Sequence, residues 1–351
     1  MRLRLHDIAL PLRHAFTIAH GTTTVQRNLL VELEQDGVVG YGEAAPSLAY
    51  GAVTVATIRE ALESVRPQIE NTTLTDPPAL WDRLQPALDR HRFALCALDA
   101  AAHDLWGKLR HQPVWRLWGL DPARLPFSNY TIGLDTIPRM IAKMKEFDGW
   151  PIYKIKLGTD DDLAIVRALR RHTDAVFRID ANTAWTAEQT IAGAPELREL
   201  GVEFIEQPLP RDDWDGMKRV HRACALPVIA DESCQTEADV ARCAGHFHGI
   251  NIKLTKAGGL TPARRMIEDA RRRGLSVMAG CMKESSVGIS AIAPLLPLLD
   301  FADMDGALLL ARDIARGVRL EKGRPILPDG DGLGIEITDP SALADSPAAG
   351  R

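Results

Sequence analysis

Five strand-like runs follow one another in the middle of the chain: PIYKIK at residues 151–156, AVFRID at 175–180, VEFIE at 202–206, LPVIAD at 226–231 and GINIK at 249–253. Each run is largely apolar until it ends in a lysine or a carboxylate, and a helical pattern follows it. Strands that alternate with helices predict a parallel sheet. Because buried charges are costly in a protein core, charged residues at the carboxyl ends of such strands indicate a catalytic site.

The spacing of these runs predicts a barrel. Strand-like runs begin near residues 127, 152, 175, 202, 227, 249, 275 and 299, a repeat of roughly 25 residues. Seven or eight strand–helix units at this spacing, over residues 126–317, predict a modified (β/α)8 barrel of the TIM type rather than an open doubly wound sheet. No Gly-x-Gly-x-x-Gly motif opens a helix after the first strand, which argues against a dinucleotide-binding fold.

The regions on either side of the barrel have a different pattern. Residues 1–125 predict an α+β capping domain, with a hairpin turning at residues 35–37 (Gln-Asp-Gly) and helices after residue 53. The Thr-rich segment 13–27 is interpreted as a long flexible loop. Residues 318–351 are expected to leave the barrel and return to the N-terminal sheet.

The composition excludes several classes of protein. The 351 residues carry a net charge of −5, which gives no reason to expect nucleic acid or an anionic membrane as a partner. No apolar run approaches the roughly 20 residues of a membrane span, and the N-terminus lacks the apolar core of a signal peptide. The five cysteines form no Cys-x-x-Cys pair. We therefore expect a cytoplasmic enzyme that acts on a small molecule.

The charged strand ends suggest a metal site beside a pair of lysines. Alternation along a strand places Lys154 and Lys156 on one face, where repulsion is expected to lower both pKa values toward the range of a base. Asp180, Glu206 and Asp231 end three consecutive strands. Three carboxylates at one barrel mouth need a cation between them, and an all-oxygen ligand set that leaves positions open for substrate favours Mg²⁺.

A further lysine, Lys253, ends the sixth strand and is expected to lie across the barrel from Lys156 on the second. Two lysines facing each other over a metal-bound carboxylate predict a proton transfer. One lysine removes the α-proton, the metal stabilises the enediolate, and the other lysine protonates the opposite face. Lys256 is the competing candidate, but strand parity favours Lys253.

Two other classes of protein fit these residues less well. A metal-dependent hydrolase is less consistent with the sequence, because no histidine ligands lie at the strand ends. A barrel that only binds a metal or a partner is also disfavoured, because the sequence contains the full set of acid, base and ligand residues that catalysis requires.

The strand ends resemble those of a known family, the muconate lactonizing enzyme subgroup of the enolase superfamily. The motifs that carry the resemblance are Lys154-x-Lys156, Asp180-Ala-Asn182, Glu206-Gln-Pro208, Asp231-Glu-Ser233 and Lys253-Leu-Thr-Lys-Ala-Gly-Gly259. The resemblance covers nearly the whole chain, including the capping domain and the C-terminal return.

The resemblance implies a role for each of these residues. Lys156 and Lys253 would form the acid/base pair, and Lys154 would polarise the substrate carboxylate. The implied Mg²⁺ ligands are Asp180, Glu206 and Asp231. The implied supports behind the ligands are Asn182, Gln207 and Glu232.

Two further stretches resemble the dipeptide epimerases within this subgroup. Cys281-Met-Lys-Glu284 follows the seventh strand, and Asp303-Met-Asp305 follows the eighth. By this likeness Asp303 and Asp305 hold the α-ammonium of a dipeptide, in a subsite that would repel the dicarboxylate substrate of a cycloisomerase. The alternative role for this pair is capping of the segment after Gly306. The other substrate-binding residues that the likeness implies are Ile18, His20, Thr131, Cys281, Met282 and Glu284.

The expected activity is therefore Mg²⁺-dependent epimerisation at the α-carbon of the C-terminal residue of a dipeptide, by a homo-oligomer. Cycloisomerisation and dehydration to an o-succinylbenzoate-type product are the alternative outcomes of the same half-reaction. The first loop, near residues 16–25, has no Arg or Lys at its tip. A glutamate side chain would meet no cation there, so an apolar or otherwise different second residue is expected.

Overall fold

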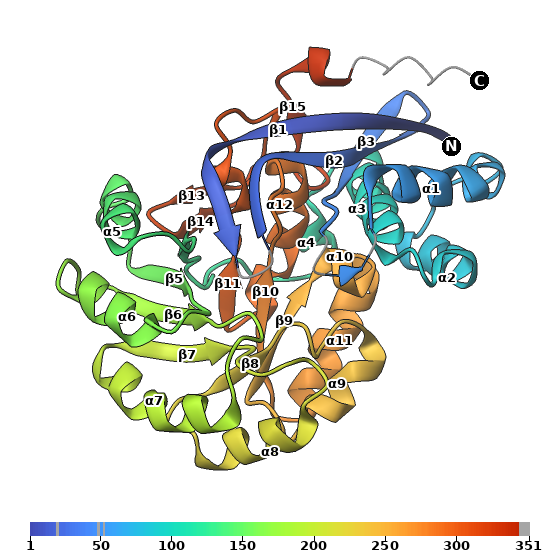
Figure 1. Ribbon diagram of the computed structural model, residues 1–351. Helices are drawn as coiled ribbons and strands as arrows, with labels where there is room; N and C mark the ends of the chain where they lie inside the picture. Colours follow the sequence, from blue (N-terminus) through green and yellow to red (C-terminus); the bar gives the residue numbers. More distant parts are fainter. Residues whose placement is uncertain (19–20, 48–49, 52, 344–351) are drawn as a thin grey trace.

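The centre of the molecule is a parallel sheet. The computed structural model describes residues 1–18, 21–47, 50–51 and 53–343, and within them eight parallel strands pair in the order of the sequence. A backbone bridge between Ser128 and Ala302 links the two ends of this sheet, which curls into a nearly closed barrel (Figure 1). The strands are β4 (Tyr130–Ile132), β5 (Ile152–Lys156), β6 (Val176–Asp180), β7 (Val202–Glu206), β8 (Val228–Ala230), β9 (Gly249–Lys253), β10 (Ser276–Gly280) and β11 (Phe301–Asp303). The predicted barrel is confirmed.

Helices cover the outside of the barrel (Figure 1). They are α5 (Ile137–Glu146), α6 (Asp162–Arg170), α7 (Ala187–Glu199), α8 (Trp214–Ala223), α9 (Glu237–Cys243), α10 (Leu254–Ala257), α11 (Leu260–Arg272) and α12 (Ser286–Ile292), followed by the 3-10 helix η2 (Ala293–Leu298). In the described chain β11 is followed by a short 3-10 helix, η3 (Gly306–Leu309), and not by an α-helix. This explains why the sequence gives no clear signal for an eighth helix.

The N-terminal region forms an antiparallel sheet with helices beside it. The sheet contains β1 (Arg2–Ile18), β2 (Gly21–Gln35) and β3 (Val38–Ala44). The helices are α1 (Val55–Glu70), α2 (Pro77–Leu88), α3 (Arg92–Leu109) and α4 (Val114–Leu117). The prediction of a loop over residues 13–27 is wrong, because β1 and β2 continue to pair from Phe16 and Thr23 to Ile18 and Gly21. The segment contains four threonines together with Phe16, Ile18 and Val25, and all of these residue types favour strands.

Two glycines let the N-terminal sheet lie directly on a helix. A Cβ atom at Gly40 or Gly42 of β3 would collide with backbone atoms of α3. The absence of side chains at these positions therefore brings β3 and α3 into close contact. Leucine side chains of α1, α2 and α3 complete a separate hydrophobic core, to which Leu62, Leu84 and Leu98 belong.

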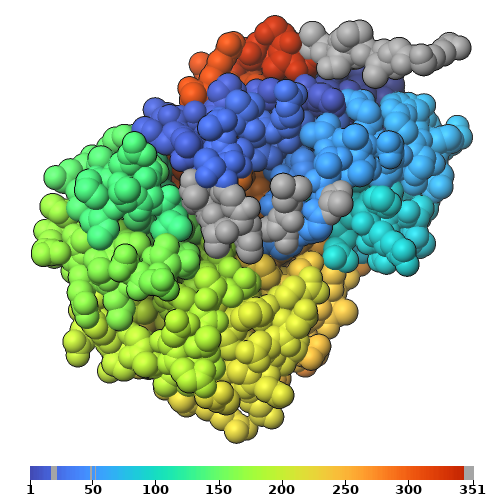
Figure 2. Space-filling view, in the orientation of Figure 1, coloured from blue at the N-terminus to red at the C-terminus, as the bar shows by residue number. Residues whose placement is uncertain are grey.

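The capping region is joined to the barrel through a buried carboxylate. Glu43 of β3 accepts hydrogen bonds from the backbone N–H groups of Ser285 and Gly288, at 3.1 Å each, and from the Ser285 hydroxyl. Asn28 of β2 donates to Glu43 at 2.6 Å and to the Lys283 carbonyl at 3.0 Å. The N-terminus of α12 thus lies against the sheet, and the N-terminal residues, in blue, sit on one end of the barrel (Figure 2).

The C-terminal tail leaves the barrel and returns to the N-terminal helices. Its short strands are β12 (Ala315–Arg316), β13 (Arg319–Glu321), β14 (Arg324–Ile326) and β15 (Glu336–Ile337), and these pair with one another rather than with the β1–β3 sheet. The Val114 N–H donates to the Gly332 carbonyl at 2.8 Å, and the Leu333 N–H donates to Asp104 of α3 at 2.8 Å. The last described element of the tail is the 3-10 helix η4 (Pro340–Leu343), which contacts β1. None of the helices in the described residues has the length and apolar character of a membrane span.

Candidate active site

Three carboxylates meet at the carboxyl ends of consecutive barrel strands. Asp180 ends β6, Glu206 ends β7 beside it in register, and Asp231 follows β8. All three are fully buried, and one oxygen atom of each lies within 4.8 Å of the others. The Asn251 amide donates to Glu206 at 2.7 Å, and the Asn182 N–H donates to Asp180 at 3.0 Å. The three predicted metal ligands therefore share one centre.

The chemistry of this centre fits a hard divalent cation. The donors are carboxylate oxygens from three strands, the ligand type that Mg²⁺ prefers. Glu206 Oε2 is buried and accepts no hydrogen bond among the described residues, although Lys154 Nζ lies 2.7 Å away. A carboxylate oxygen that accepts no hydrogen bond is available to coordinate a metal ion.

Lys154 is enclosed by carboxylates. Its ammonium nitrogen lies 2.7 Å from Asp303 and 3.1 Å from Asp180, in addition to Glu206, and its side chain is 2% exposed. Burial alone would lower the pKa of Lys154, but the three carboxylates outweigh burial and raise it above the ordinary value. The expectation that repulsion from Lys156 lowers the pKa of Lys154 is therefore wrong, because the nearby negative charges outnumber the positive ones.

Lys156 and Lys253 approach one cavity from opposite sides of the barrel. In the sheet order β5 and β9 are four strands apart among eight, which places them across the barrel from each other. Lys156 Nζ lies 2.5 Å from Asp180, and Lys253 Nζ lies 2.7 Å from Asp231. Burial by itself would lower the pKa of Lys253, but the charges around it, that of Asp231 first, together outweigh burial and raise the pKa above its ordinary value.

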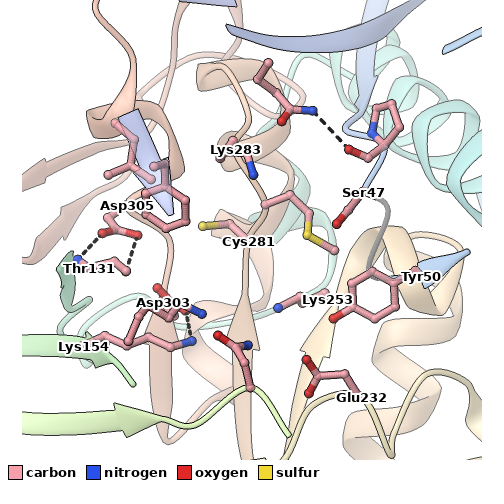
Figure 3. A pocket seen from close by; sticks show the side chains of 17 residues that line it. Ser47, Tyr50, Thr131, Lys154, Glu232, Lys253, Cys281, Lys283, Asp303 and Asp305 are labelled. Carbon is pink, nitrogen blue, oxygen red and sulfur yellow. Dashed lines mark hydrogen bonds and ion pairs between the residues drawn. The ribbon is translucent and has the colours of Figure 1, made fainter. Parts of the chain in front are cut away.

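The competing lysine, Lys256, has a different position. It is buried, does not line the cavity, and donates to the Asp231 carboxylate and to the backbone carbonyls of Asp231, at 2.7 Å, and Asn251, at 3.2 Å. Lys256 thus holds a metal-ligand candidate in place, while Lys253 faces the cavity (Figure 3).

A second acidic pair lies on another wall of the same cavity. Asp303 accepts from the Asn129 amide at 2.8 Å, and Asp305 accepts from the N–H and the hydroxyl of Thr131 (Figure 3). Burial favours the neutral form of both carboxyls. The Lys154 ammonium nevertheless lowers the pKa of Asp303 to about 2, whereas burial and the charge of Asp303 raise the pKa of Asp305 to about 7. This wall can therefore accept hydrogen bonds from a cationic group.

The structure brings most of the predicted site residues to this cavity. Those that line it are Thr131, Lys154, Lys156, Asn182, Glu232, Lys253, Cys281, Met282, Asp303 and Asp305. Gln207 lies behind it, where its side-chain oxygen accepts from the N–H groups of Asp231 and Ser233, at 3.0 and 3.1 Å. Gln207 thereby fixes the turn that carries Asp231.

Three predicted substrate-binding residues are not placed in the cavity. Glu284 is buried outside the cavity lining, where burial and the charge of Glu43 raise its pKa to about 8. Ile18 ends β1, but its side chain lies outside the described part of the structure. His20 lies outside the described residues altogether.

The sequence did not identify several residues that line the cavity. They are Phe16, Gln26, Pro46, Ser47, Tyr50, Lys283 and Leu309. The Tyr50 hydroxyl donates to Asp231 at 3.2 Å, so that a residue of the N-terminal region contacts a metal-ligand candidate of the barrel. Lys283 stands beside Cys281 and Glu284 in the sequence, which was the only signal that could have drawn attention to it.

Comparison with known proteins gives matches along nearly the whole chain. Residues 2–119 match the family described as mandelate racemase / muconate lactonizing enzyme, N-terminal domain, and residues 138–341 match the enolase C-terminal domain-like family. The chain is 54% identical to the L-Ala-D/L-amino acid epimerase of Maribacter sp. over 338 residues, which cover 96% of this chain and 99% of that protein.

Solved structures of dipeptide epimerases have the same fold. The substrate-liganded L-Ala-D/L-Glu epimerase from Bacillus subtilis superposes with a TM-score of 0.90 at 28% identity, covering 95% of this chain and 98% of that one. The dipeptide epimerase from Methylococcus capsulatus, in complex with Mg and the dipeptide L-Arg-D-Lys, gives a TM-score of 0.88 at 31% identity, again covering 95% and 98%.

Proposed function

Because the chain belongs to the mandelate racemase / muconate lactonizing enzyme family of the enolase superfamily, we propose that it is a Mg²⁺-dependent dipeptide epimerase. The reaction inverts the α-carbon of the C-terminal residue of the dipeptide. The observation that carries the proposal is that Lys156 and Lys253 line one cavity from strands on opposite sides of the barrel. Such a pair can reach both faces of one carbon atom.

The substrate carboxylate binds at the carboxylate centre. Asp180, Glu206 and Asp231 would hold the cation, which would supply the positive charge that makes the α-proton of a bound carboxylate acidic. Lys154, fixed by its carboxylate neighbours, presents a second positive charge to the same group. Both charges are desolvated, which strengthens their effect on the substrate.

The two facing lysines exchange the proton. The neutral lysine on one side takes the hydrogen from the α-carbon, and the charged lysine on the other side donates a proton to the opposite face. One C–H bond breaks and one forms, so that the product differs from the substrate in configuration alone. Running the reaction backward reverses the roles of Lys156 and Lys253.

The acidic pair binds the other end of the dipeptide. Asp303 and Asp305 lie on a separate wall of the cavity and accept the hydrogen bonds of the α-ammonium. This arrangement disfavours the alternative reactions on the same scaffold, because a cycloisomerase or an o-succinylbenzoate-type dehydratase acts on an anion that Asp303 would repel.

The proposal extends to the assembly and compartment of the enzyme. The five cysteines are unpaired in the structure, which supports a reducing compartment such as the cytoplasm. A homo-oligomer is the expected assembly, and sedimentation analysis of the purified chain tests it.

Solvent exchange tests the proposed reaction. A set of L-Ala-L-X dipeptides is incubated with the enzyme and Mg²⁺ in heavy water, and each dipeptide is examined by mass spectrometry for one added deuterium and by chromatography for the L,D epimer. Incorporation that depends on Mg²⁺ is the expected result. No incorporation into any dipeptide would overturn the proposal.

A variant separates the epimerase from the alternative reactions. Asp303→Asn is expected to lower kcat/KM for dipeptides at least about 30-fold, because it removes the charge that pairs with the ammonium. Mg²⁺ binding, followed by calorimetry, is expected to persist. The exposed Asp329→Asn serves as the matched control. Unchanged dipeptide turnover in Asp303→Asn would remove the ammonium subsite from the proposal.

A further inference from the structure

Lys283 brings a fourth ammonium group to the cavity, and it differs from the other three. Lys154, Lys156 and Lys253 each form an ion pair with at least one carboxylate. Among the described residues Lys283 forms no ion pair and its ammonium group makes no hydrogen bond; its ammonium lies over the ring of Phe16, 5.4 Å from the centroid. Within the described part of the chain, this cation therefore has no negative partner.

The backbone holds this side chain in position. The Lys283 carbonyl accepts from the Asn28 amide at 3.0 Å, and the next two residues are buried under β3. Figure 3 shows the Lys283 side chain entering the cavity above Cys281, apart from the wall formed by Asp303 and Asp305. Two elements thus fix the cation at the side of the cavity nearest to the N-terminal sheet.

The surroundings of Lys283 favour an incoming anion. Burial, followed by the charges of Lys156 and Lys253, lowers the pKa of Lys283 to about 8. The group is still mostly protonated at neutral pH, so three ammonium groups repel one another across the cavity. A carboxylate that entered between them would relieve this repulsion without any change in the protein.

We propose that Lys283 binds a carboxylate on the side chain of the C-terminal residue of the substrate, so that the enzyme prefers dipeptides ending in glutamate or aspartate. This inference rests on the proposed function. The α-carboxylate of the dipeptide occupies the metal centre and its ammonium lies at Asp303 and Asp305. Among the described residues that line the cavity, the remaining cation is Lys283, which faces the same lysines that flank the α-carbon.

The cation comes from a segment other than the first loop. That loop has no Arg or Lys at its tip, and this absence led to the expectation of a second residue other than glutamate. In the structure, the segment after β10 supplies Lys283, and the N-terminal hairpin contributes the Phe16 ring beneath it. An acidic side chain therefore meets a cation although the loop carries none.

Two dipeptides of nearly equal shape test the inference on the unmodified enzyme. L-Ala-L-Glu and L-Ala-L-Gln differ at the side-chain terminus, where one carries a carboxylate and the other an amide. The expected kcat/KM for deuterium incorporation is at least about 10-fold higher for L-Ala-L-Glu, as for a hydrogen bond between charged groups. Equal values for the two dipeptides would overturn the inference.

Variants at Lys283 assign the preference to this residue. Lys283→Met is expected to reduce the Glu/Gln ratio to near one, and Lys283→Arg is expected to retain a preference for glutamate. Lys218→Met, at an exposed position of α8, is the matched control and should keep the full ratio. A ratio that survives in Lys283→Met contradicts the inference.

Failure of the inference and failure of the proposed function give different results. If the enzyme exchanges L-Ala-L-Gln and apolar dipeptides but does not prefer glutamate, only the role of Lys283 is wrong. If no dipeptide exchanges, the proposed function itself is wrong and the inference falls with it.

Discussion

At the scale of single residues, Lys154 contacts three carboxylates, whereas Lys156 and Lys253 contact one each. Moving Lys154 would leave the buried carboxylates of Glu206 and Asp303 without an ion-pair partner, which is costly, whereas Asp180 would keep Lys156. Lys156 and Lys253 each give up only one ion pair when they turn toward a substrate. The number of carboxylate partners therefore distinguishes Lys154 from the two lysines that are proposed to transfer protons.

The two-sided arrangement predicts different defects for two similar variants. Lys156→Met and Lys253→Met are each expected to lower epimerisation by at least about 100-fold, because each removes a general acid or base. Each variant should still exchange the α-proton of one epimer with heavy water, and the two variants should exchange opposite epimers. Proton NMR of the L,L and L,D dipeptides measures this. Exchange of the same epimer by both variants would place the lysines on one face.

The buried Glu284 predicts how stability depends on pH. Burial and Glu43 raise its pKa from the ordinary 4.5 to about 8, so the folded protein retains a proton that the unfolded chain releases. Its contribution to stability is therefore complete below about pH 4.5 and is lost as the pH rises through 8. Between pH 6 and pH 9, the melting temperature of Glu284→Gln should therefore fall less than that of the parent protein.

A control keeps this pH experiment specific. Asp305 and Glu232 also have raised pKa values, so the parent protein should lose stability at alkaline pH for more than one reason. Glu60→Gln, at an exposed position of α1, should leave the pH dependence as in the parent. An unchanged slope in Glu284→Gln would mean that its carboxyl is ionised in the folded state.

At the scale of secondary-structure elements, the barrel residues were predictable because a local pattern encodes them. Alternation in a strand and the position of its last residue place Asp180 and Lys253 at the barrel mouth without knowledge of the tertiary structure. The segment 13–27 was misread, because its many threonines were taken as a loop signal although they also favour strands.

Other site residues could not be predicted, because their positions depend on distant contacts. Tyr50 reaches the site through a hydrogen bond to a carboxylate 181 residues later in the chain. Lys283 enters the cavity because its backbone is bound by Asn28, 255 residues earlier. No spacing within the sequence reports such contacts, whereas a resemblance to a family carries over only the residues that share its motif.

The N-terminus of α12 predicts a stability effect that crosses the two regions. The Ser285 side chain accepts from the Val287 N–H at 3.2 Å as a helix cap, and its hydroxyl also donates to Glu43. Ser285→Ala should therefore reduce the free energy of unfolding by more than the loss of an ordinary helix cap does. We expect it to destabilise the protein by about 1 kcal/mol more than Thr54→Ala, which removes the exposed cap of α1. Urea unfolding measures both, and equal costs would contradict the cross-region role.

At the scale of the whole molecule, buried hydrogen bonds join the N-terminal region to the barrel. Trp81 of α2 donates to the Gly258 carbonyl at 2.8 Å, and Asp99 of α3 accepts from the N–H and the hydroxyl of Thr261, at 2.8 Å each. These contacts meet the segment that follows Lys253. The N-terminal helices are therefore bound to the segment that follows Lys253, one of the two lysines proposed to transfer protons.

The metal centre connects β6, β7 and the turn after β8, and this predicts that Mg²⁺ stabilises the molecule as a whole. A ligand that binds only the folded state at about 100 times its Kd adds about 2.7 kcal/mol of stability. The melting temperature should therefore rise with Mg²⁺ and fall again with a chelator. In Glu206→Gln this response should be lost while the fold persists, because Lys154 keeps Asp180 and Asp303 as partners. Glu199→Gln, at the exposed end of α7, should respond as the parent does. A full response in Glu206→Gln would show that the cation binds elsewhere, since a site that needs three strands cannot lose one ligand without losing affinity.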